Sequence, residues 1–128
     1  MVRLTAPISA GDLMDRITIL WLKSRRLRAE AGRLAADMEA KELEAILAKA
    51  WIAMPDKMTR LSEVNTTLWE LEDAMRAALA AGSDADIADL SRKIVDGNAE
   101  RARIKAEINR DTGSAFFEYK DYGTKTPD

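Results

Sequence analysis

Residues 64–76, VNTTLWELEDAMR, have the apolar spacing of an α-helix but carry polar side chains on the apolar side. At about 100° per residue, four apolar side chains share one stripe: Leu61, Leu68, Met75 and Leu79. Glu72 falls inside this stripe, Asn65 and Arg76 lie at its edge, and Trp69 flanks them. A carboxylate that faces a core costs several kcal/mol unless a cation or hydrogen-bond donors lie opposite it. We therefore expect another helix to supply a partner for Glu72.

The composition predicts helix throughout the chain. Ala, Leu, Glu, Lys and Arg dominate its 128 residues, and strand-forming patterns are sparse. A chain of this length builds one hydrophobic core. We predict an all-α, single-domain protein with a four-helix bundle over residues 9–112, an N-terminal arm over residues 1–8 and a C-terminal tail over residues 113–128.

Capping and turn residues divide this bundle into four predicted helices: Ser9–Ala31, Met38–Met54, Asp56–Ala81 and Asp84–Asp111. Ser9 is followed three residues later by Asp12, a pattern typical of a helix N-terminus. Gly32 and a loss of apolar phase beyond Met38 indicate a break between the first two helices. Pro55 ends the second helix, and Gly82 is the expected C-terminal cap of the third.

Charge and composition exclude several kinds of chemistry. The net charge of −2 gives no general attraction to nucleic acid or acidic membranes, and the basic run KSRRLR at residues 23–28 is typical of a solvated helix face. The absence of cysteine and histidine removes disulfides, thiolate nucleophiles, histidine bases and the usual zinc sites. Glu72 and Asp73 diverge on a helix, so we expect no metal site and no cofactor. Without a signal peptide or membrane-spanning run, we expect a cytoplasmic protein with no membrane partner.

The first helix is apolar around almost its whole circumference between Ile17 and Leu22. A helix of this kind is normally buried on all sides, and a small bundle offers little to surround it. We therefore expect a homo-oligomer that forms through Ile17, Trp21 and Leu22.

The fourth helix changes character along its inner face. Three apolar residues, Ile87, Leu90 and Ile94, are followed on that face by Asn98, Arg101 and Lys105, and Asn109 continues the polar line. Arg101 or Lys105 is the expected partner of Glu72.

Cations outnumber carboxylates among these inward positions, which predicts an anionic ligand. The predicted ligand-binding residues come from three helices: Arg16, Lys23, Asn65, Trp69, Glu72, Arg76, Asn98, Arg101, Lys105 and Asn109. The alternative is a polar network that satisfies itself without a ligand. In the tail, the aromatic segment SAFFEYKDY, residues 114–122, is expected to dock on the bundle or on a neighbouring subunit.

Three segments resemble an uncharacterised family of small bacterial and phage helical proteins, a domain of unknown function. They are residues 6–23 (APISAGDLMDRITILWLK), 64–76 and 98–114 (NAERARIKAEINRDTGS), with Glu118, Lys120 and Tyr122 beyond them. The polar positions of the family correspond to all ten residues of the predicted site, and to Asp12, Asp15 and Asp73 as well. Trp21 departs from the pattern. The resemblance implies an all-helical fold and no known activity.

Three function classes remain open. The first is binding of a nucleotide or a phosphorylated or carboxylated metabolite, with Trp69 available for stacking. The second is a cofactor-free enzyme whose architecture resembles that of helical chorismate mutases, without a residue-by-residue match. The third is an interaction module whose polar interior sets the register of its helices.

Overall fold

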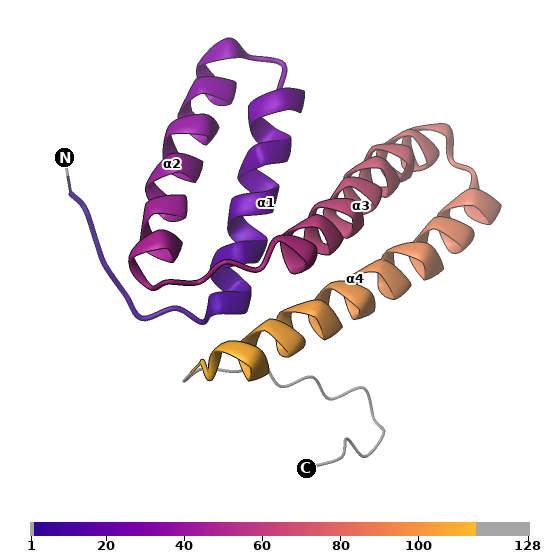
Figure 1. Cartoon of the computed structure of the whole chain (residues 1–128). Helices are drawn as coiled ribbons and strands as arrows, with labels where there is room; N and C mark the ends of the chain where they lie inside the picture. Colours follow the sequence, from indigo (N-terminus) through magenta and orange to yellow (C-terminus); the bar gives the residue numbers. More distant parts are fainter. Residues whose placement is uncertain (1, 115–128) are drawn as a thin grey trace.

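The computed structural model describes residues 2–114, so the predicted docking of the aromatic tail lies outside the described residues. Four helices account for most of the described chain: α1 (Ala10–Arg26), α2 (Glu30–Lys49), α3 (Pro55–Ala81) and α4 (Asp84–Thr112). The described residues contain no strand. The all-α prediction with four helices is therefore confirmed, and Figure 1 shows them as two antiparallel hairpins, α1–α2 and α3–α4.

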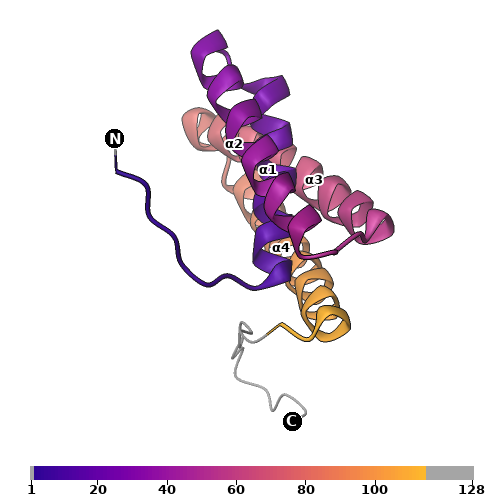
Figure 2. The ribbon, with the colours of Figure 1, turned by 60° about the vertical axis from the view of Figure 1, so that its left-hand side comes forward.

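Helix α1 is the centre of the molecule. It packs against all three other helices, whereas α2 packs along α1 and α3 packs along α4. Figure 2 places α2 in front of α1 and the α3–α4 hairpin behind it. The two hairpins meet near the start of α1 and diverge toward their loops (Figure 1).

This central position explains why α1 is apolar on all sides. Ile17 is fully buried, Leu22 retains 2% of its exposure, and Trp21 is partly covered, with its Nε1 donating to Glu44 Oε1 at 2.7 Å. The chain's own helices cover the residues that predicted self-association. Self-association stays a prediction, but its original physical reason is removed.

Helix α1 ends earlier than predicted, at Arg26 rather than Ala31, and α2 runs continuously through Gly32. The prediction of a break at Gly32 was wrong because the break comes earlier, at Leu27, whose backbone is extended. Arg33 Nη1 donates to the carbonyl oxygens of Leu27 at 2.7 Å and Arg28 at 2.8 Å. These bonds satisfy the carbonyls of the two residues that follow α1 and hold the turn between α1 and α2.

The other boundaries follow the sequence more closely. The third helix ends at Gly82 (φ 68°), the predicted cap, and the fourth ends at Gly113 (φ 65°); both glycines adopt the left-handed conformation. Helix α2 ends at Lys49, five residues before the predicted end at Met54. Its last turn closes on Trp51, which adopts a φ of 60°.

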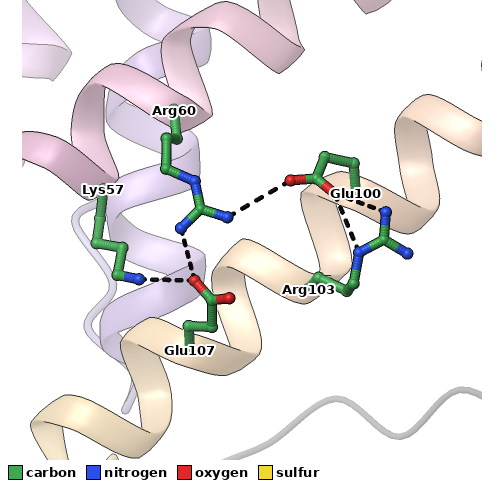
Figure 3. A network of polar contacts seen from close by, with 5 residues as sticks. All are labelled: Lys57, Arg60, Glu100, Arg103 and Glu107. Carbon is green, nitrogen blue, oxygen red and sulfur yellow. Dashed lines mark hydrogen bonds and ion pairs between the residues drawn. The ribbon is translucent and has the colours of Figure 1, made fainter.

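Ion pairs join α3 to α4 at the open side of their hairpin. Glu107 Oε2 accepts from Lys57 Nζ at 2.6 Å and from Arg60 Nη1 at 2.7 Å, and Figure 3 shows both cations reaching down from α3. Arg60 also approaches Glu100 at 3.5 Å. The hydrogen bonds from Lys57 and Arg60 lower the pKa of Glu107 to about 2.

Replacing Glu107 by Gln is expected to lower the free energy of unfolding at pH 7 by about 1 kcal/mol, because these groups are partly exposed and solvent screens the pairs. The folded-state pKa lies below the ordinary value of 4.5. The contribution is therefore complete above that ordinary value and is lost as the pH falls toward 2. Urea unfolding of both proteins at neutral and acidic pH measures the difference.

The difference between wild type and Glu107→Gln should shrink on acidification. Glu63→Gln, at an exposed position on α3, is the control and should show no such pH dependence. A stability difference that stays constant between neutral and strongly acidic pH would contradict the role given to Glu107.

Candidate functional site

A buried carboxylate does lie among the predicted polar residues, but it is Asp15 of α1. Its side chain is 5% exposed and accepts two hydrogen bonds from Arg101, from Nε at 2.9 Å and from Nη2 at 2.5 Å. Asn65 Nδ2 donates to Asp15 Oδ1 at 2.9 Å and to Thr18 Oγ1 at 2.9 Å. The bidentate Arg101 fork and the Asn65 amide thus join α1, α3 and α4 around one carboxylate.

A second ion pair lies one turn farther along α4. Lys105 Nζ is 2.8 Å from Asp12 Oδ1, and the Lys105 side chain is only 14% exposed. Burial alone would raise the pKa of Asp12, but the hydrogen bond and the charge of Lys105 outweigh burial and lower it. This pair continues the contact between the start of α1 and the second half of α4.

The end of α4 caps the N-terminus of α1. The backbone N–H of Gly11 donates to Asn109 Oδ1 at 2.8 Å, and that of Ala10 donates to Ser114 Oγ at 3.0 Å. Ser9 caps Asp12 N at 3.1 Å, as predicted. The first N–H groups of a helix have no partner within it, so these side chains satisfy them from across the interface.

Glu72 is exposed, and the prediction that it faces the core beside Arg101 was wrong. In the α3–α4 hairpin, Gly97 packs against Leu68. Glu72, one turn nearer the loop, therefore lies level with Lys93, and Arg101 lies about 12 Å farther along α4. The helical wheel placed Glu72 on the same face of α3 as the buried Asn65 and Leu68, but that face is already exposed at Glu72.

The other predicted residues separate into different surroundings. Arg16 is exposed and pairs with Glu39 of α2 at 2.6 Å, so it does not face the core. Lys23 is exposed in the last turn of α1, and Asn98 is exposed on α4. The structure thus brings together Asn65, Arg101, Lys105 and Asn109, but places Arg16, Lys23, Glu72 and Asn98 apart from them.

Trp69 and Arg76 line an open cleft of about 690 Å³ between the end of the α1–α2 hairpin and α3. Arg26, Leu27 and Arg28 form one wall, and the α3 residues Trp69, Asp73, Arg76 and Ala77 form the other. We call this the arginine cleft. It lies where the two hairpins diverge.

The walls of the arginine cleft carry three guanidinium groups and one carboxylate. Arg76 pairs with Asp73 on the same helix, and both side chains are more than half exposed. Arg26 contacts Glu70 only at 3.3 Å, and Glu70 is 63% exposed. The cleft therefore has a positive surplus, and its existing pairs are solvated and exchangeable.

A family model matches residues 4–128, nearly the whole chain. The chain belongs to a family of unknown function, DUF6165. No curated protein and no solved structure matches the chain. Membership of DUF6165 confirms the resemblance to an uncharacterised helical family.

Two further findings describe this DUF6165 chain. Within residues 2–114, no group of three or more acidic side chains is placed to hold a metal ion. None of the helices in that range is long and apolar enough to cross a membrane.

Asp15 was not among the site residues predicted from the sequence, although it corresponds to a polar position of the family that the chain resembles. The signal lies in its neighbours on α1. Gly11, Thr18 and Leu22 recur at helical spacing on the same side as Asp15, and all of them are buried. Gly11 and Thr18 are small and lie on either side of Asp15 on this second inward face of α1. Small residues beside a carboxylate on such a face indicate that another helix approaches closely there.

Proposed function

We propose that this protein binds a small anionic ligand in the arginine cleft, and that the ligand combines a phosphate or carboxylate with a planar ring, as a nucleotide does. The observation that carries the proposal is the position of three arginines and one half-buried tryptophan around a single open cleft. The ligand-binding residues are Arg26, Arg28, Trp69 and Arg76, of which Trp69 and Arg76 were predicted from the sequence.

Guanidinium groups suit this role because their planar forks bind phosphate and carboxylate oxygens in pairs. Arg28 lies in the loop after α1, with an exposed side chain. An incoming anion would replace the long Arg26–Glu70 contact of 3.3 Å by a shorter, charge-assisted bond. Asp73 pairs with Arg76, and both line the cleft. Asp73 therefore neutralises only one of the three cations.

Trp69 supplies the preference for a ring. Stacking of a base on an aromatic side chain contributes about 1 to 3 kcal/mol and accepts any base, because every base has a π face. Trp69 is partly buried against the bundle and still lines the cleft, so its position is fixed while part of its indole faces the space. An anion without a ring should therefore bind more weakly than a nucleotide.

Part of the basic charge here has a structural explanation. The C-terminal end of a helix favours cations, and Lys23, Arg25 and Arg26 occupy the last turn of α1. This explanation does not extend to Arg28, which lies beyond the helix, or to Arg76, which lies within α3. The proposal depends on these two residues more than on the basic run as a whole.

The buried residues have a different role in this proposal. Asn65, Arg101, Lys105 and Asn109 contact groups of α1, and these contacts hold the two hairpins together. They support the cleft indirectly, because the angle between the hairpins sets its width.

Isothermal titration calorimetry with ATP, AMP and inorganic phosphate tests the proposal. We expect the nucleotides to bind and phosphate alone to bind more weakly. Arg28→Met should weaken nucleotide binding by about tenfold to a hundredfold, the equivalent of losing one or two charge-assisted hydrogen bonds. Trp69→Leu should reduce the advantage of the nucleotides over phosphate.

Arg92→Met is the matched control, because Arg92 is an exposed arginine on α4 outside the cleft. It should bind nucleotides as the wild type does. If no nucleotide binds, or if Arg92→Met and Arg28→Met weaken binding equally, the cleft is not the site. Tight binding of a single-stranded oligonucleotide with no response to mononucleotides would instead assign the basic surface to nucleic acid.

A further inference from the structure

Exposed apolar side chains concentrate in the N-terminal arm, in α2 and in the turn after α2. Nine large hydrophobic residues are exposed within the described chain, and seven of them belong to the N-terminal arm, to α2 or to the turn after α2. We call this the α2 face and define it by Val2, Leu4, Leu34, Met38, Ile46 and Trp51. Three exposed large hydrophobic residues are outside this definition. Ile8 ends the N-terminal arm, and Leu79 and Val95 belong to the α3–α4 hairpin.

Helix α2 has apolar residues on two opposite sides. Ala36, Ala40 and Leu47 are buried against α1. Leu34 and Met38 point away from that contact and are 57% and 69% exposed. A surface helix with one covered side normally carries charged residues on the other, so this second apolar side is unexplained within one chain.

Trp51 is the most exposed of these residues, at 94%, and its backbone is also unfavourable. Its φ of 60° lies in the left-handed region, which bulky residues rarely adopt and glycine adopts freely. Glycine would close this helix end with less strain, and the indole gains almost no contact within the chain. A strained, fully exposed tryptophan is best explained by a contact outside the chain.

We propose that the α2 face is an interface between two copies of this chain, packed about a two-fold axis with their α2 helices antiparallel. The axis passes between Lys41 and Glu42, near the middle of α2. Met38 of one copy then faces Ala45 of the other, where the small side chain permits close approach. Trp51 reaches the first turns of the second α2 helix.

The charges favour a second copy as the occupant. Three cations, Arg3, Lys41 and Lys49, and two anions, Asp37 and Glu42, border the apolar stripe. Within the chain, Lys41 pairs with Asp37 at 2.9 Å and Arg3 pairs with Glu42, and both pairs are exposed. A two-fold axis between Lys41 and Glu42 brings each Lys41 beside the other copy's Glu42, so the face is complementary to itself. Nucleic acid and acidic membranes require a strong positive surplus instead, whereas three cations and two anions leave this face close to neutral.

The N-terminal arm widens the same surface. Arg3 binds both oxygens of Glu42, at 3.0 and 3.1 Å, and this pair holds the arm beside α2. Val2 and Leu4, on either side of Arg3, are 85% and 87% exposed. Stable interfaces bury about 800 Å² on each partner, more than one helix face supplies, and the arm adds apolar area to it.

Sedimentation velocity of the full chain at micromolar concentrations tests the interface. We expect the wild type to be a dimer and Met38→Glu to be a monomer. Leu79→Glu is the matched control, because Leu79 is similarly exposed, at 60%, but lies outside the α2 face. A monomeric wild type, or a dimer that Leu79→Glu dissociates and Met38→Glu does not, would overturn the proposal.

Trp51→Gly distinguishes a contact of Trp51 with the second copy from a role of Trp51 in the stability of the single chain. Glycine relieves the left-handed backbone, so in the Met38→Glu background the melting temperature should be unchanged or higher. In the wild-type background the same substitution should weaken dimerisation by at least about tenfold. If Trp51→Gly lowers the melting temperature of the monomer and leaves the dimer unchanged, Trp51 is structural and the proposal fails. Nucleotide binding by Met38→Glu is unaffected in either case, so this test is independent of the arginine cleft.

Discussion

Replacing Arg101 by Met is expected to lower the free energy of unfolding by about 3 to 5 kcal/mol, the usual cost of leaving a buried charge without its partner. The substitution keeps most of the side-chain volume but removes both hydrogen bonds to Asp15. The carboxylate, 5% exposed, would keep the hydrogen bond from the Asn65 amide but would lose its paired cation. Chemical denaturation of both proteins at neutral pH measures the loss.

A double-mutant cycle separates this cost from simple loss of packing. Asp15→Asn keeps the shape of the side chain and its capacity to accept from Asn65, but removes the charge. In the protein with both substitutions no unpaired charge is buried, so it should be more stable than the sum of the single effects predicts, by about 1 to 3 kcal/mol. Strictly additive effects would show that Asp15 and Arg101 stabilise the fold independently.

Replacing Gly11 by Ala is expected to destabilise the protein by about 3 kcal/mol, through overpacking and the loss of one hydrogen bond. A Cβ at this position would lie 2.7 Å from the carbonyl oxygen of Lys105 and 2.8 Å from Asn109 Oδ1. The Lys105 carbonyl is backbone, so α1 and α4 would have to separate. Separation also lengthens the bond from the Gly11 N–H to Asn109.

Gly97→Ala is the control for this second prediction. Its Cβ would also approach a neighbour to 2.7 Å, but that neighbour is the terminal Cδ2 of Leu68, which can rotate. Alanine gains up to about 1 kcal/mol over glycine inside a helix, so the net effect should be small. Thermal unfolding compares the two variants. Equal melting temperatures would contradict a close backbone contact at Gly11.

The sequence predicted the helices well where glycine and serine mark their ends. Ser9 caps the first helix and Gly82 ends the third, as the sequence predicted. It failed between α1 and α2, because Arg33 holds the turn after α1 by binding carbonyls five and six residues before it, and no local residue type signals this. Long-range side-chain caps depend on the turn that follows, which periodicity does not describe.

The candidate site was predicted only in part, and the reason is related. Periodicity correctly predicted that Asn65 on α3 faces inward, and that three polar residues of α4 do so as well: Arg101, Lys105 and Asn109. It gave no information about which helix lies opposite, and so it paired Arg101 with Glu72 instead of Asp15. It also gave no information about how far a covering helix extends, which decides that Leu68 is buried and Glu72 exposed. Both quantities depend on topology and crossing angle rather than on local pattern.

The three tryptophans allow one direct test of the arginine cleft as a ligand site. Trp69 lines the cleft, Trp21 lies between α1 and α2, and Trp51 is exposed on the α2 face. Their indole N–H signals in a ¹H–¹⁵N correlation spectrum, assigned by single Trp→Phe variants, report each location separately during titration with a nucleotide at constant protein concentration. If the arginine cleft binds the nucleotide, the Trp69 signal should shift saturably while those of Trp21 and Trp51 stay in place. An unchanged Trp69 signal at saturating nucleotide, or a shift confined to either of the other two, would show that the cleft is not the site.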